Sequence, residues 1–100
     1  MPVYLVAQST VLDADAYGTY LQRVAPIVRR HGGRFLVRGG KVTPMAGEEW
    51  NPQRIIIIEF PSEDHVRRWF ASPEYQEIVP YRKQGAKVQA VLVEGLAEQP

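Results

Sequence analysis

The chain has 100 residues, of which 45% are hydrophobic and 23% are charged, as expected for one soluble globular domain. Its formal net charge of +1 lacks the cationic excess that phosphate backbones and anionic membranes select, so we expect no membrane or nucleic-acid partner and only weak binding to duplex DNA at physiological salt. No signal-peptide pattern follows Met1 and no apolar run is long enough to span a membrane, so a cytoplasmic protein is expected.

The first third of the chain predicts a strand and then a helix. Val3 to Leu12 has apolar residues on both parities, as in a strand. Asp13 is suited to cap a helix, and Gly32-Gly33 to end it. A stripe at helical spacing predicts the buried face of this helix: Tyr17, Leu21, Val24 and Val28. Pro26 lies within this pattern and predicts a kink or a break.

The next segment predicts a hairpin. Arg34 to Arg38 is a strand that we expect to continue, after a bulge or bend at Gly39-Gly40, through Lys41 to Met45 as an edge strand. A polar turn from Ala46 to Pro52 then returns the chain as the antiparallel partner.

That partner, Arg54 to Phe60, is the strand around which the fold is organised. Successive side chains of a strand point to opposite faces, so the four isoleucines from Ile55 to Ile58 make both faces apolar. The pattern predicts a central strand that is covered on both sides.

The last part of the chain predicts helices and a final strand. Ser62 can cap a second helix, and Ser72-Pro73 can start a short third one. Pro80 to Arg82 predicts a turn or another short helix. Val88 to Leu96 is again apolar on both parities and predicts the last strand.

The order β-α-β-β-α-β predicts an α+β, ferredoxin-like antiparallel sheet with its helices on one face, as a single domain over residues 1–100. The other face of the sheet is also apolar, so something outside this chain must bury it. A second copy is the simplest candidate, and we expect a homodimer joined through this face.

Several motifs occur together: Tyr17 with Tyr20, His31 to Gly40, Gly47 to Trp50, Arg54 to Ser62, Trp69, Ser72 to Gln76, and Arg82. On these motifs nearly the whole chain resembles the family called domain of unknown function 1330, within the dimeric α/β-barrel superfamily. The resemblance implies a ferredoxin-like subunit that dimerises through its sheet, forming a dimeric α/β barrel, and it implies no established activity. The family pattern has an aromatic residue where this chain has His31. Relatives in the superfamily include cofactor-free monooxygenases, small isomerases and heme-dependent enzymes, so the analogy does not select a reaction.

Arginine and aromatic residues suggest a ligand pocket. Arg38, Arg54 and Arg82 could join Trp69 and Tyr75 in an aromatic-walled site for a small anion, although exposed arginines are also common on ordinary surfaces. The tryptophan of the polar turn, Trp50, either folds over the end of the core or forms the lip of such a pocket.

The usual catalytic and metal-binding patterns are absent from the sequence. Cysteine is missing and two histidines without paired spacing predict no metal site, and no cofactor is expected. Glu59 interrupts the isoleucine strand, which indicates either structural pairing or a general base. His31 can serve as a helix cap or, with Glu59 and Tyr75, as a candidate titratable group. Three hypotheses remain: a dimeric module that binds a small anionic or aromatic ligand, a cofactor-independent monooxygenase-like or isomerase-like enzyme, and a structural dimer without a cavity.

Overall fold

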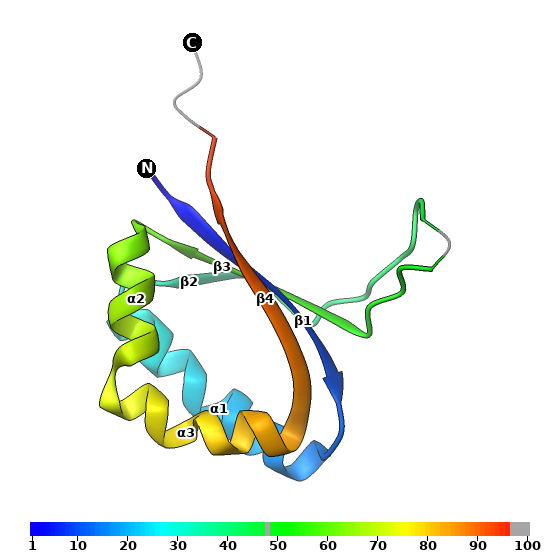
Figure 1. Ribbon diagram of the computed structural model, residues 1–100, viewed down its shortest axis with the longest axis horizontal. Coiled ribbons are helices and arrows are strands. Elements are labelled where there is room, and N and C mark those ends of the chain that lie inside the picture. The colour runs from blue at the N-terminus through cyan, green and yellow to red at the C-terminus, as the bar shows by residue number, and fades with distance from the viewer. Residues whose placement is uncertain (48, 97–100) are drawn as a thin grey trace.

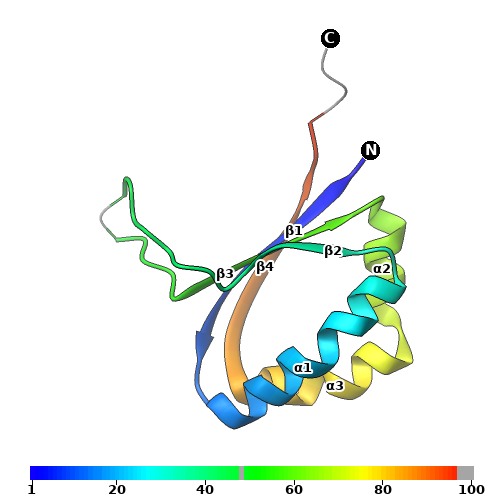
Figure 2. The same cartoon turned by 180° about the vertical axis from the view of Figure 1, so that it is seen from behind.

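An antiparallel sheet and three helices make up the part of the chain that this computed structural model describes, residues 1–47 and 49–96. The elements in chain order are β1 (Val3–Val11), α1 (Ala14–Arg30), β2 (Arg34–Arg38), β3 (Arg54–Phe60), α2 (Glu63–Ala71), α3 (Pro73–Gly85) and β4 (Ala86–Glu94). The strand order is β2-β3-β1-β4, and every neighbouring pair is antiparallel. All three helices lie on one face of the sheet (Figures 1 and 2). The predicted ferredoxin-like α+β fold is therefore confirmed.

The isoleucine strand β3 lies between β2 and β1, as its apolar pattern predicted. Ile56, Ile58 and Phe60 are buried beneath the helices. Ile55 and Ile57 alternate with them and therefore point to the other face. We call that side the open face. The strand register places these apolar side chains on it: Tyr4, Val6, Val37, Ile55, Ile57, Val91 and Val93.

The two prolines expected to interrupt helices do not do so. Helix α1 continues through Pro26, so the predicted break is wrong, and the alternative of a kink stays a prediction. Residues 80–82 are helical, as one of the two alternatives predicted, but they belong to the continuous helix α3 and form neither a turn nor a separate short helix. A proline removes the hydrogen bond to the carbonyl four residues earlier, which is that of Gln22 in α1 and of Gln76 in α3. Both prolines and both of these residues are exposed. Water can therefore solvate the freed carbonyl, and the helix does not have to end.

The predicted continuation of β2 beyond Arg38 is also wrong. Gly39 has a φ of 75°, which turns the chain while its N–H bonds the Ile55 carbonyl at 3.0 Å. The register shift of β2 lies at Leu36, between Phe35 and Val37, three residues before the bulge or bend expected at Gly39-Gly40. Residues 41–47 and 49–53 then extend away from the sheet and helices as an arm (Figure 1).

The remaining boundaries follow the predicted caps. Asp13 accepts the N–H groups of Ala16 and Asp15 at 3.1 Å. The bond from Ala16, followed by one from Gln84 Nε2, holds the pKa of its carboxyl below the ordinary value. Gly32 has a φ of 84° at the end of α1.

Strand β4 starts at Ala86, two residues before the predicted start. None of the helices within residues 1–47 and 49–96 has the length and apolar character needed to cross a membrane.

Candidate functional site

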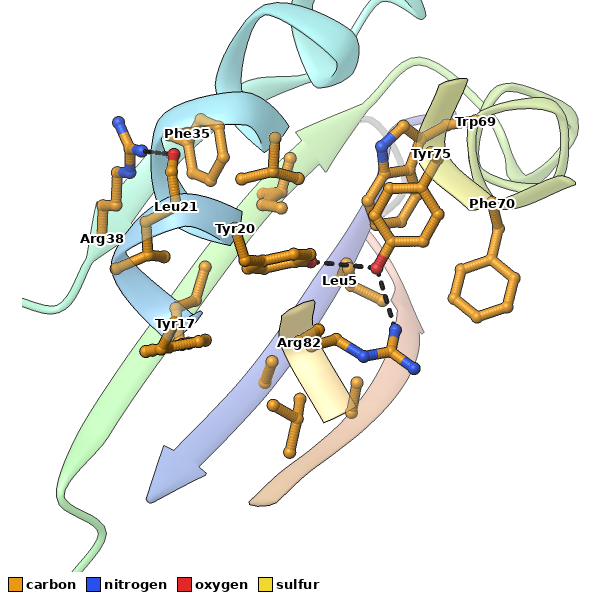
Figure 3. Close-up of a pocket in the computed structure, with 16 residues that line it drawn as sticks. Leu5, Tyr17, Tyr20, Leu21, Phe35, Arg38, Trp69, Phe70, Tyr75 and Arg82 are labelled. Atoms are coloured by element: carbon orange, nitrogen blue, oxygen red, sulfur yellow. Dashed lines mark hydrogen bonds between the residues drawn. The ribbon is translucent and has the colours of Figure 1, made fainter. Parts of the chain in front are cut away.

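A cavity of about 90 Å³ lies between the sheet and the helices (Figure 3). Its walls are apolar side chains of all four strands, together with aromatic side chains of the three helices. Phe70 lies at its edge and is 49% exposed, whereas the neighbouring Trp69 is only 2% exposed. The cavity therefore has a closed aromatic interior and a rim that solvent reaches.

Two tyrosine hydroxyls and an arginine form the polar end of this cavity (Figure 3). Tyr20 Oη and Tyr75 Oη are 2.9 Å apart, and Arg82 Nη1 donates to Tyr75 Oη at 2.9 Å. The hydroxyl pair has two protons, and the bond between the rings uses one of them. Because the described residues provide no acceptor for the second proton, it is available to a ligand.

Helix α3 sets the geometry of this polar end. Tyr75 and Arg82 are seven residues apart, two helical turns, and so share one face of the helix. Ser72 caps the helix by accepting the Tyr75 N–H at 3.2 Å. The ring of Tyr75 lies 4.4 Å from that of Trp69, centroid to centroid. The Ser72 cap therefore holds the backbone of Tyr75, and the Trp69 ring holds its side chain.

Tyr20 remains neutral in this setting. Burial is the main cause that raises the pKa of its hydroxyl, and the neighbouring Tyr75 raises it further. A phenolate in this apolar environment would lose its hydration, so Tyr20 acts as a neutral hydrogen-bonding group and not as a base.

Arg82 is a cation without a carboxylate partner among residues 1–47 and 49–96. Its side chain is half-buried, and its guanidinium carbon lies 6.0 Å from the centre of the Phe70 ring. An arginine in a partly desolvated position forms strong charge-assisted hydrogen bonds with anions. The rim therefore offers a place for a negatively charged group.

The structure brings some of the predicted ligand residues together and separates others. Arg38, Trp69, Tyr75 and Arg82 line the cavity, but the Arg38 guanidinium is turned away from it and donates to the Leu21 carbonyl at 2.6 Å (Figure 3).

Two other predicted ligand residues lie outside the cavity lining. Arg54 lies 5.6 Å from the centre of the Tyr17 ring and fills the space beside Gly39. Trp50 is 64% exposed and donates to Gln8 Oε1 on the open face at 3.2 Å. The three arginines expected to form one anion-binding cluster thus each have a different partner.

Of the three candidate titratable groups, Tyr75 is the one in the cavity. Glu59 lies on the open face, where it accepts from Tyr4 at 3.1 Å and from Arg34 at 2.9 Å. The bond to Glu59 is the main cause that raises the pKa of Tyr4. His31 caps the C-terminal end of α1, with Nδ1 2.8 Å from the Ile27 carbonyl. In the described residues no group of three or more potential metal ligands comes together.

Tyr20 and Phe70 are site residues that the sequence did not predict. The available signal was weak: Tyr20 is a hydroxyl-bearing residue on the buried face of a helix, and a buried tyrosine hydroxyl usually requires a partner. That partner, Tyr75, is 55 residues away in the sequence, so no local spacing could identify it.

Comparison with known families and structures gives a family match and several fold relatives. The family described as "Domain of unknown function (DUF1330)" matches residues 2–96. No curated protein sequence matches the chain significantly.

Three solved structures show the range of the structural relatives. RPA0582 of Rhodopseudomonas palustris, a protein of unknown function, superposes with a TM-score of 0.78 at 18% identity, over 97% of this chain and 84% of that one. SnoaB of Streptomyces nogalater, a cofactor-independent oxygenase, superposes with a TM-score of 0.69 at 21% identity, over 99% of this chain and 97% of SnoaB. A dimeric protein of unknown function with a ferredoxin-like fold, from Bacteroides fragilis, superposes with a TM-score of 0.55 at 11% identity, over 94% of this chain and 96% of that one. At these identities the likeness establishes the fold and no activity.

Proposed function

We propose that this chain, which belongs to the DUF1330 family, binds a small aromatic anion in the cavity between its sheet and its helices. The observation that carries the proposal is Arg82, an unpaired cation among the described residues that bonds a tyrosine hydroxyl at the rim of an aromatic-walled cavity. Such a site combines apolar walls, which take a ring, with a few convergent polar groups, which orient it.

The size of the cavity limits the ligand. Its volume of about 90 Å³ is below the roughly 150 Å³ of an engineered protein cavity that takes up benzene. A single ring with at most one small substituent is therefore the largest group that we expect to enter, and it enters only if the cavity widens. We expect Phe70 to move outward for it, because this rim side chain is 49% exposed. The anionic group would stay at the rim, beside Arg82.

We also propose that the protein works as a homodimer joined through its open face. Val91 is 60% exposed there and continues an apolar surface that includes Ile55 and Ile57. A patch of this kind usually marks a protein interface. The fold relative from Bacteroides fragilis, which is dimeric, supports this assembly.

Catalysis by a cofactor-independent, monooxygenase-like or isomerase-like enzyme is the alternative proposal. Its support is the free hydroxyl proton of the Tyr20–Tyr75 pair, held next to Arg82 inside the cavity, together with the fold shared with the oxygenase SnoaB. Acid catalysis requires a proton donor in contact with the bound ligand. The same donor could also bind a ligand without any reaction, so binding remains the first proposal.

Replacing Arg82 by glutamine is expected to weaken binding of benzoate, our probe for a small aromatic anion, by about 10- to 100-fold, because a hydrogen bond to a charged group contributes roughly 1.5 to 3 kcal/mol. Isothermal titration calorimetry of the wild type and the variant measures the loss. Lys83→Gln is the matched control, since it removes the same charge from the next residue of α3, which is exposed. Equal affinity of the wild type and Arg82→Gln, or no binding of benzoate to the wild type, would contradict the proposed site.

A further inference from the structure

The indole nitrogen of Trp69 has no hydrogen-bond partner, although it is buried. The residue is 2% exposed and lines the cavity, and no group among residues 1–47 and 49–96 accepts from its Nε1. A buried donor without an acceptor is costly, and such groups are rare in native proteins unless a water, an ion or a ligand satisfies them. The orphaned donor is therefore free to bond a water or a ligand group in the cavity that Trp69 lines.

The position of this donor separates it from the anion-binding rim. Figure 3 shows the Trp69 nitrogen at the end of the indole away from the Tyr75 hydroxyl, to which Arg82 is bonded. The rings of Trp69 and Tyr75 lie side by side, with centroids 4.4 Å apart. A ring placed against them could present one polar group to Arg82 and a second one to Trp69.

The chemistry of the indole defines the second group. An indole N–H only donates, so its partner must be a hydrogen-bond acceptor. Aromatic rings surround Trp69, with centroids 5.6 Å away for Phe60 and 5.8 Å for Phe70. No cation–aromatic contact to Trp69 occurs in the described residues. Because a charged acceptor would lose its hydration there without compensation, a neutral oxygen is favoured.

We infer that the ligand of this cavity is an aromatic anion that also bears a neutral carbonyl oxygen, which accepts the N–H of Trp69. This inference rests on the proposed function, because it assumes that the anionic group of the same ligand lies at Arg82. It narrows the ligand class to aryl carbonyl compounds with an acidic group at position 3 or 4 of the ring relative to the carbonyl.

Matched benzoates test this inference. We expect 3- or 4-formylbenzoate to bind about 3- to 10-fold more tightly than the methylbenzoate of the same substitution pattern, as one neutral hydrogen bond predicts. The methyl compounds keep the carboxylate and a similar shape, and they lack the acceptor. In Trp69→Phe the preference should disappear while the methylbenzoates still bind, and Trp50→Phe, the matched control, should retain it.

A direct readout is the indole resonance of Trp69 in ¹⁵N-labelled wild-type protein. The chain has two tryptophans, so the Trp50→Phe variant assigns both signals. We expect the Trp69 indole proton to move downfield with a formylbenzoate and not with its methyl counterpart. This measurement shows whether the ligand carbonyl accepts the Trp69 N–H even if Trp69→Phe fails to fold.

Three results would overturn the inference and leave the proposed function intact: equal binding of the formyl and methyl compounds, an undiminished preference in a folded Trp69→Phe variant, or an indole resonance that does not move downfield. The last of these is expected if a trapped water is the partner of the indole. Binding of none of the four compounds to the wild type would overturn the inference and the proposed function together.

Discussion

An aspartate in place of Ile57 is expected to convert a dimeric protein into monomers or to unfold it. Ile57 is on the open face, paired with Val6 of β1. Burial of each isoleucine against a partner contributes roughly 1.5 to 3 kcal/mol before the association entropy is subtracted. A carboxylate buried at the centre of the interface would cost more than this gain.

Sedimentation at low micromolar concentration measures the outcome. The wild type should give one dimeric species, and Ile57→Asp should give monomers or lose the unfolding transition of the wild type. Gln22→Asp is the control, because it introduces the same group at an exposed position of α1 and should remain dimeric. A well-folded monomeric wild type would contradict the proposed assembly, because the open face would then be exposed to water.

Replacing Gly85 by alanine is expected to destabilise the protein by about 3 kcal/mol, in the upper part of the range for overpacking. Gly85 lies where the end of α3 meets the start of α1, and its carbonyl accepts from Leu12 at 2.8 Å and from Asp13 at 3.0 Å. A Cβ added at Gly85 would overlap the backbone nitrogen and Cα of Tyr17. Backbone atoms held in two packed helices cannot move aside as a side-chain tip can.

Urea denaturation of paired glycine variants tests this contact. Gly18 is the matched control, since it lies within α1 and a Cβ added there meets no atom within 4 Å. Gly18→Ala should stabilise the protein by roughly 0.5 to 1 kcal/mol, because alanine favours a helix over glycine. If Gly85→Ala were as stable as the wild type, the close approach of α1 and α3 would be wrong.

Local patterns in the sequence were sufficient to predict much of the fold. The run from Ile55 to Ile58 identified a central strand, because alternation within a strand makes two apolar faces. Asp13, Ser62 and Ser72 identified helix starts through short-range capping, and all three caps are present. The break at Pro26 and the end of the third helix before Pro80 were mispredicted, because propensity alone does not reveal whether the freed carbonyl faces water.

The site was less predictable, because it depends on contacts between distant segments. Tyr75 and Arg82 share a helix face at a spacing that the sequence displays. Their contact with Tyr20 depends on how α1 and α3 pack. Arg54 alternates with Ile56 and therefore points to the same, helix-covered face of β3. Its guanidinium lies against Tyr17 and Gly39, a position that depends on tertiary packing. Trp50 lies in the connection between β2 and β3, four residues before β3 begins, and nothing in its neighbours predicted the bond to Gln8 on the open face.

A crystal structure of the protein with bound benzoate would show directly where the ligand lies. The proposed function predicts the ring in the cavity, against Trp69 and Tyr75, with the carboxylate within hydrogen-bonding distance of Arg82. Benzoate bound on the open face beside Trp50, or an empty cavity at a benzoate concentration that saturates binding in solution, would contradict it.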